Sequence, residues 1–220
     1  MMERPICPAS TVASRHVYAR VVPGAIYTHC KAHNLNLCII HACKEPLIRN
    51  VMDTIQTIAF AFDYSAKRLL AYAEALGEDE RAQDQMDKRQ KLKTLCETRW
   101  ASRAEALYTF KAAFTTVHLA LEKLAGEGDG KAAMYQSAMS KFGFIVALVA
   151  AEHVLSGLVN LSNFLQKKEC DLLSAVQYAK EVKRVINAER NDPLVWETLY
   201  ESACDMATLI DVQPSMPRVA

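Results

Sequence analysis

The hydrophobic positions of the chain recur at helical spacing over most of its length. Apolar side chains follow this period from residue 34 to 62, where Pro46 fits the first position of a helix. Further helices are expected at 65–76, at 132–166 as one long or two broken apolar helices, and at 172–186. The pattern therefore predicts a mainly α protein.

The best-marked helix lies in the middle of the chain. Ser102 is followed three residues later by Glu105, a capping-box pattern that predicts the start of a helix. The helix should end at Gly126, before the flexible glycine-rich loop 126–130. An apolar stripe runs along it, formed by Leu107, Phe110, Phe114, Val117, Leu121 and Leu124. We expect this stripe in the core of a helical bundle, in preference to a dimer seam.

Two other segments are marked by their composition. Asp192 and Pro193 suit the N-cap and first turn of a last helix, which should run to about residue 210. Trp196, within that helix, is expected in the core. Residues 78–93 carry many charges and almost no apolar side chains, which predicts a solvated helix in preference to a flexible connector.

Residues 25–30 form the one credible strand, because they are β-branched and aromatic over a short length. Residues 1–24 contain three prolines and no sustained period, so a loose N-terminal segment is expected, as is a frayed tail at 213–220. A lone strand leaves its backbone donors and acceptors unpaired on both sides. We therefore expect that the strand belongs to an incomplete core whose other strands lie upstream.

Composition limits the classes of protein to consider. The 220 residues are 51% hydrophobic, enough for one substantial core, and the net charge of +1 gives no strongly basic field. Seven scattered cysteines and an N-terminus without an apolar signal region indicate a nuclear protein, with the cytoplasm as the alternative. The apolar run 142–151 is shorter than the roughly 20 residues of a membrane span. We expect a buried helix there and no membrane partner.

Four motifs occur in a characteristic order: YTHCKAHNLNL at 27–37, TLCETRWASRAEAL at 94–107, LVNLSNFLQKKECDLLSA at 158–175, and a Pro-Arg pair at 217–218. With these motifs the chain resembles, from about residue 23 to 218, transposases of the hAT superfamily and their domesticated relatives, including the zinc finger MYM-type protein 1 group. The resemblance implies a ribonuclease H-like core interrupted by an all-α insertion domain.

That resemblance divides the chain into parts. Residues 25–62 would be a remnant of the ribonuclease H-like core, and 63–212 would be the helical insertion domain. Cys30 and His33 would lie at the end of a core strand, close to the active centre. The two alternatives for this pair are a buried thiol beside a hydrogen-bonded imidazole, and a zinc site.

A zinc site would recruit Cys38 and His41, which follow Cys30 and His33 closely. The apolar residues around Cys38 and His41 indicate a helix, which would point these side chains toward different faces. No metal or other cofactor is therefore predicted, and zinc remains the minority alternative.

The second motif suggests a nucleic-acid contact. The resemblance implies that the Trp100 indole stacks on a displaced base, with Arg99 beside it. Independently, an indole just before a helix N-terminus and close to Arg99 and Arg103 offers a stacking face, amide donors and two guanidinium groups. The alternative is that Trp100 anchors the start of the helix in the core.

Catalysis is not expected from this chain. The enzymes that it resembles need three carboxylates to hold two metal ions, and Glu3 is the only acidic residue before Glu45. We therefore predict a transposase-derived, catalytically inactive fragment with residual DNA binding. The alternative is an all-α interaction module with a protein partner, and the sequence gives no support for an oligomer.

Overall fold

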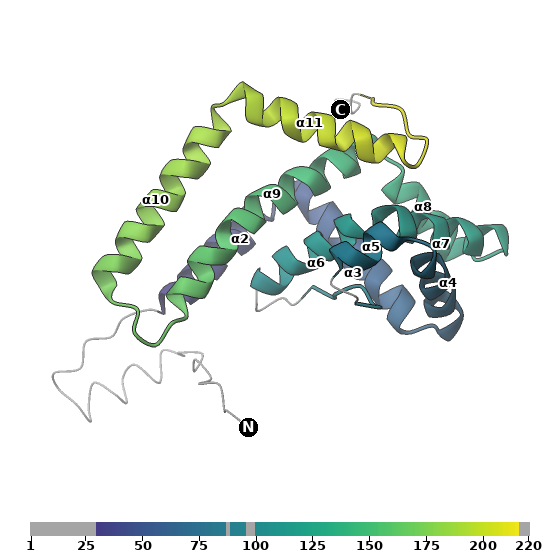
Figure 1. Ribbon diagram of the computed structural model, residues 1–220, viewed down its shortest axis with the longest axis horizontal. Helices are drawn as coiled ribbons and strands as arrows, with labels where there is room; N and C mark the ends of the chain where they lie inside the picture. Colours follow the sequence, from purple (N-terminus) through teal and green to yellow (C-terminus); the bar gives the residue numbers. More distant parts are fainter. Residues whose placement is uncertain (1–29, 87–88, 96–99, 216–220) are drawn as a thin grey trace.

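The computed structural model describes residues 30–86, 89–95 and 100–215, and 79% of these residues are helical. Within them the helices are α2 (Lys31–Ala42), α3 (Pro46–Asp63), α4 (Ala66–Gly77), α5 (Glu80–Gln85), α6 (Trp100–Ala112), α7 (Phe114–Gly126), α8 (Gly130–Met139), α9 (Phe142–Leu165), α10 (Leu172–Arg190) and α11 (Pro193–Thr208). The prediction of a mainly α protein is confirmed (Figure 1).

The predicted strand at 25–30 lies, except for Cys30, outside the described residues, as do 1–24 and 216–220, and the described residues contain no strand. Cys30, the last residue of the predicted strand, directly precedes α2, and its carbonyl accepts a hydrogen bond from the Asn34 N–H at 3.0 Å. His33 therefore lies in the first turn of α2.

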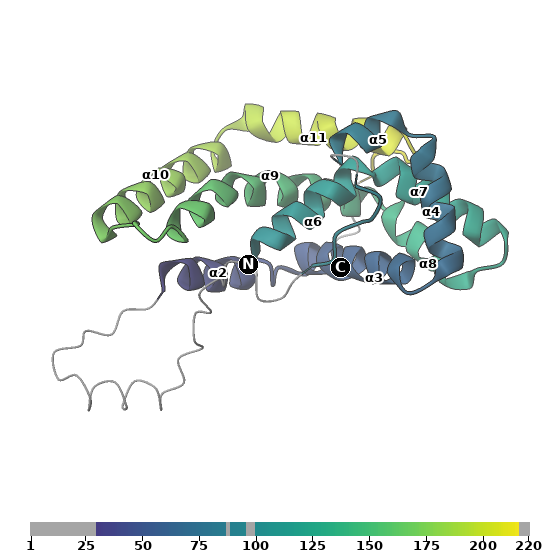
Figure 2. The same cartoon turned by 60° about the horizontal axis from the view of Figure 1, so that its bottom comes forward.

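Helix α9 is the centre of the fold. It packs against α2, α3, α6, α8, α10 and α11 (Figures 1 and 2). By length and composition it could cross a membrane, but much of its apolar surface is buried by the other helices. Glu152, near its middle, pairs with Lys111 at 2.9 Å and accepts from the Ser156 hydroxyl at 2.6 Å. In this fold α9 is thus a core helix, as predicted.

The predicted central helix is in fact two helices. The expected stripe from Leu107 to Leu124 is fully buried, so its assignment to the core is confirmed. However, the helix breaks at Ala113, between α6 and α7. The Thr109 hydroxyl donates to the Ala106 carbonyl at 3.1 Å, a local bond of the kind that bends helices. As a result α6 packs mainly on α9, whereas α7 packs on α4 and α8.

The predicted capping box is also absent. Helix α6 begins at Trp100, so Ser102 lies within the helix. Glu105 instead pairs with Lys93, and with Arg89 at 2.9 Å. The hydrogen bond from Lys93, followed by the one from Arg89, lowers the pKa of Glu105. These ion pairs hold the segment that contains Arg89 and Lys93 against α6.

The charged segment 78–93 is neither a continuous solvated helix nor a wholly exposed connector. Among its described residues, Glu80–Gln85 is the helical part, and the apolar side chains of Met86 and Leu92 are buried. The Tyr72 hydroxyl lies 3.5 Å from the sulfur of Met86, and burial raises the pKa of Tyr72 well above its ordinary value. Two buried apolar side chains therefore hold this polar segment on the core.

The glycine-rich loop before α8 is anchored by an ion pair that the sequence did not reveal. The Arg68 guanidinium contacts both carboxylate oxygens of Asp129, at 2.7 and 3.0 Å. Asp129 is also the N-cap of α8, accepting from the amides of Lys131 and Ala132. The hydrogen bond from Arg68 is the main reason that the pKa of Asp129 falls to about 2. Helices α4 and α8 are thereby tied together across the loop.

Candidate nucleic-acid interface

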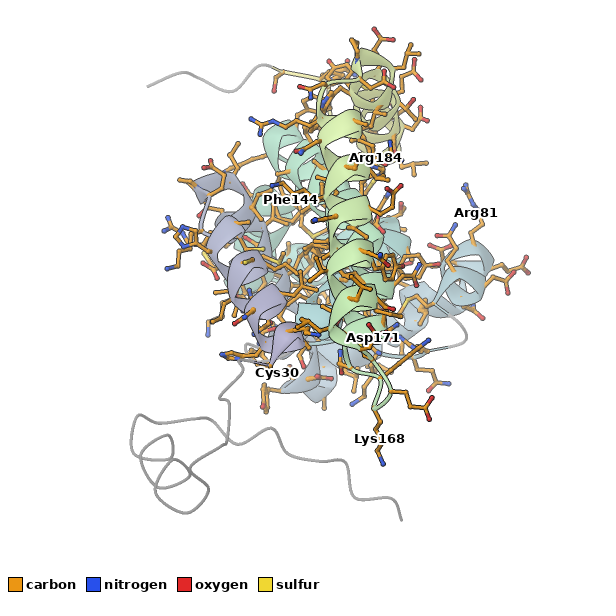
Figure 3. All side chains as sticks on the ribbon, turned by 90° about the vertical axis from the view of Figure 1, so that its left-hand side faces the viewer. Cys30, Arg81, Phe144, Lys168, Asp171 and Arg184 are labelled. Carbon is orange, nitrogen blue, oxygen red and sulfur yellow. The ribbon has the colours of Figure 1, made fainter. Side chains whose placement is uncertain are left out.

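Helix α2 carries the first group of candidate residues. Cys30 and His33 are both exposed, so neither is the buried core residue considered from the sequence. Cys38 and His41 are exposed on the same helix, whose buried residues are Asn36 and Ile39. Figure 3 shows Cys30 at the end of the molecule where α9 turns into α10. The candidate side chains of α2 therefore face outward. The opposite side of the helix, with Asn36 and Ile39, packs on the rest of the fold.

The four candidate zinc ligands all lie in the described part of the chain. Among the described residues, no three His, Cys, Asp or Glu side chains form a group that could hold a metal ion. Although the four side chains share the outward side of the helix, residues 30 to 41 extend over about 16 Å of its axis, too far for all four to meet at one ion. The geometry thus offers no argument for the zinc alternative.

The second group of candidates begins α6. Arg99 lies outside the described residues, and the structure describes the backbone of Trp100 but not its side chain. Arg103, one turn into α6, lies close enough to Cys43, at the end of α2, for its charge to act on the Cys43 thiol. Burial raises the pKa of the Cys43 thiol, against the opposing effect of the Arg103 charge. The structure therefore brings Arg103 to the end of α2, and so joins the two motif-bearing segments.

The partner of Arg103 could not have been identified from the sequence. Cys43 is 60 positions away, and nothing in its local pattern distinguishes it from the other cysteines of α2. The contact arises because α2 and α6 both pack on α9 and meet beside it (Figure 2). Spatial adjacency of this kind depends on the tertiary fold.

Most charged side chains of this surface are basic, although the exposed Glu45 directly follows Lys44. Residues 31–44 contain Lys31, Lys44 and two histidines, and no acidic residue. Lys31 is partly exposed and Lys44 is exposed. Glu105, the acidic residue of α6 closest to Arg103, is engaged by Arg89 and Lys93. The junction of α2 and α6 is thus a local basic surface on a chain that is nearly neutral as a whole.

A second surface feature lies at the other side of α9. An open apolar hollow of ≈ 380 Å³ is lined by Val146, Ala150, Trp196, Glu197, Leu199 and Tyr200. Trp196 is 46% exposed, so the prediction that it lies in the core is wrong. Its indole N–H donates to the Arg190 carbonyl at 3.0 Å. Trp196 lies on the same side of α11 as the buried Ala203 and Ala207, but it borders the open hollow between α11 and α9 and not the closely packed part of their contact.

Two of the known proteins that the chain matches carry the same name. The chain is 25% identical over 204 residues to the human protein named "52 kDa repressor of the inhibitor of the protein kinase". It is 24% identical over 205 residues to the mouse (Mus musculus) protein of the same name. Each match covers 89% of this chain, but only 26% and 27% of the respective relatives. The chain thus spans about a quarter of the length of these curated relatives.

No family model matches the chain, and no solved structure matches it. The similarity to the two repressors is distant, yet it extends over nearly all of the helical fold. The relatives are named for repression and not for an enzymatic reaction.

Proposed function

We propose that this chain is a non-catalytic, transposase-derived helical module of the hAT type that contacts nucleic acid through the junction of α2 and α6. The closer likeness to the zinc finger MYM-type protein 1 group, the division into a core remnant at 25–62 and an insertion domain at 63–212, and a nuclear location belong to the same proposal. Helix α3, which contains the proposed boundary at residue 62, packs on both α4 and α9. The two proposed parts therefore share one hydrophobic core.

The observation that carries the proposal is the packing of α6 against α2, which brings Arg103 close to the Cys43 thiol at the end of α2. It joins two motif segments that are far apart in sequence, on a surface that contains basic groups and few free carboxylates. A phosphate backbone is attracted to such a surface, and an aromatic ring at the start of α6 would supply a stacking platform. Repression by the relatives is in keeping with binding and needs no catalysis.

The test is fluorescence anisotropy with a labelled single-stranded oligonucleotide over a range of salt concentrations. Stacking of a base on an aromatic ring is worth about 1–3 kcal/mol, so Trp100→Ala should weaken binding by about 5- to 150-fold with little change in the salt slope. Lys44→Gln and Arg99→Ala should each flatten the slope by up to about 0.7. Lys131→Gln, on the exposed side of α8, is the matched control and should change nothing.

Two results would contradict this proposal. One is equal binding by the Trp100→Ala variant and the parent chain, with circular dichroism and thermal melts showing that both are folded. In that case Trp100 would be an anchor of the helix and not a platform. The other is an equal change of slope in the Lys131→Gln control, which would mean that the binding is nonspecific.

The absence of catalysis is tested separately. The chain, incubated with supercoiled DNA and magnesium or manganese, should neither nick nor join it, since two-metal chemistry needs a cluster of carboxylates. Cleavage above a mock-purified control, lost on mutation of an acidic residue of this chain, would show that the fragment is an enzyme.

A second candidate function is favoured by a separate observation. The described chain exposes large apolar side chains along α10 and α11, and the hollow beside Trp196 is open to solvent. Apolar surface of this kind is typical of protein interaction sites. The second candidate is therefore an all-α interaction module with a protein partner.

A further inference from the structure

The side of α11 that borders the hollow against α9 combines aromatic rings with carboxylates. Trp196 and Tyr200 are one helical turn apart and about half exposed. Glu197 and Glu201 are likewise one turn apart, each directly following an aromatic residue. Helical geometry places these two pairs in adjacent rows on the helix surface. We call these four residues the acidic aromatic face.

Both rings of the acidic aromatic face are held in place. The Trp196 indole is hydrogen-bonded to the Arg190 carbonyl at 3.0 Å. The Tyr200 ring packs edge-on against Phe142 of α9, with centroids 5.8 Å apart and planes at 83°. A side chain that is already ordered loses little entropy when a partner arrives. The face is therefore organised before binding, as expected for a recognition surface.

The charge around this face is of one sign. Residues 191–215 contain no lysine, arginine or histidine, and their acidic residues are Asp192, Glu197, Glu201, Asp205 and Asp211. Within the described part of the chain, no salt bridge engages Glu197 or Glu201. The basic residues nearest in sequence on adjoining helices are Lys141, before α9, and Arg190, at the end of α10. The face thus has an apolar centre and an acidic border.

We propose that the acidic aromatic face binds a basic amphipathic helix of another protein. Apolar side chains of that helix would enter the hollow between α9 and α11, and its lysine or arginine side chains would pair with Glu197 and Glu201. Helices bind grooves in this way through anchors spaced one turn apart, and a tryptophan beside a pocket is a typical energetic centre. The carboxylates disfavour a phosphate backbone as the occupant of this face.

This inference rests on the second candidate function and names its partner by chemistry. It concerns a different surface from the proposed nucleic-acid contact, which involves α2 and α6. The proposal of DNA binding and the proposal of helix binding can therefore be disproved independently. Each is tested with substitutions on its own surface.

The probe is a synthetic helical peptide with leucine at the first, fourth, fifth and eighth positions of a repeating stripe and lysine elsewhere. A second peptide carries glutamate in place of every lysine. Titration of the full chain, followed by fluorescence anisotropy, should show saturable binding of the lysine peptide and none of the glutamate peptide. Salt should weaken the interaction, because surface charges are screened.

Substitutions locate the binding. Trp196→Ala should weaken binding of the lysine peptide by at least about 30-fold, the effect of removing a central anchor. Tyr64→Ala, at an aromatic residue that is 84% exposed at the end of α3, is the control and should have no effect. Joint replacement Glu197→Gln and Glu201→Gln should reduce both the affinity and its salt dependence. The control for that charge change is Glu78→Gln with Glu80→Gln, at exposed sites on α4 and α5.

A direct optical readout accompanies these variants. The chain has two tryptophans, so a Trp100→Phe background leaves Trp196 as the one indole. Its emission should shift to shorter wavelength when the lysine peptide covers it. This measurement uses a folded chain with Trp196 in place, and so it holds even if Trp196→Ala proves unstable.

Three outcomes would overturn the proposal. The first is no saturable binding of the lysine peptide at concentrations up to about 1 mM, the weakest affinity that a specific site would be expected to have. The second is an equal loss of affinity in the control variants. The third is a dimer in sedimentation experiments that Trp196→Ala dissociates, which would make a second copy of the chain the occupant.

Discussion

Helices α7 and α10 carry similar apolar repeats but lie in opposite surroundings. The stripe that α7 continues from α6 is fully buried between α4, α8 and the rest of the core. In α10, Ala175 is the one buried residue, although Leu172, Val176, Val182 and Ile186 follow the same helical period. Leu172 and Val176 are 64% and 42% exposed. The repeat predicts a helix in both cases, but it does not tell how much of the helix a partner covers.

The difference follows from how many helices surround each one. Helix α7 lies between two neighbours, whereas α10 packs mainly along the second half of α9 and meets α11 at an elbow (Figure 1). A helix that packs on a single neighbour leaves the rest of its surface exposed to solvent. We therefore expect stability to be concentrated in the body around α7 and binding to be concentrated in the arm formed by α10 and α11.

The largest expected effect is in the body. Leu121→Ala removes a side chain that has no exposed surface, and should lower the free energy of unfolding by about 2–5 kcal/mol because a cavity remains. Chemical denaturation followed by circular dichroism measures this loss. A change below about 0.5 kcal/mol would remove the contrast between the two regions.

A smaller effect is expected at the ion pair between α4 and α8. Asp129→Asn keeps an N-cap side chain but removes the charge that pairs with Arg68, and should cost about 1–2 kcal/mol at neutral pH. The pKa of Asp129 is about 2 in the folded chain and ordinarily near 3.8, so its contribution is present above about pH 5 and is lost as the pH falls toward 2.

The same variant tests that pH dependence. The difference in unfolding free energy between the parent and Asp129→Asn should shrink over this acidic range, measured by denaturation at several pH values. A difference that stays constant would show that the charge of Asp129 makes no contribution. Asp53→Asn, at an exposed carboxylate in α3, serves as the control and should leave the acid profile of the parent unchanged.

The next effect concerns a buried histidine of α7. His118 lies 3.2 Å from the Ser140 hydroxyl, and burial lowers its pKa below the ordinary value of 6.5. The unfolded chain therefore binds a proton before the folded chain does, and stability should fall as the pH drops below about 6.5, by at most about 1.4 kcal/mol per pH unit. His118→Gln should lack this slope, whereas His41→Gln, at an exposed position, should retain it. Equal slopes in both variants would contradict the assignment.

The smallest expected effect is in the arm. Leu172→Ala shortens an exposed side chain of α10 and should change the free energy of unfolding by no more than about 0.5 kcal/mol. The measurement is the same denaturation used for Leu121→Ala, with the two leucines as a matched pair. A loss comparable to that of Leu121→Ala would mean that the arm is covered in solution.

Much of the helical fold could be predicted from local signals. Ser65 caps α4, Pro46 begins α3, and Asp192 with Pro193 begins α11, because caps and first-turn prolines depend on a few adjacent residues. The candidate site was predicted less completely. Its motif segments were identified, but the strand predicted to end at Cys30 lies almost wholly outside the described residues, and the structure describes the helix that follows it.

The sequence by itself determined where most helices lie and which stripe enters the core. These properties depend on side chains within one or two turns, and so they can be deduced from spacing alone. Only the tertiary structure decided that Arg103 meets Cys43, that Met86 is buried in a charged segment, and that Trp196 is exposed. Each of these depends on which helix surfaces meet. That choice is made by packing between residues far apart in the chain, and no local pattern encodes it.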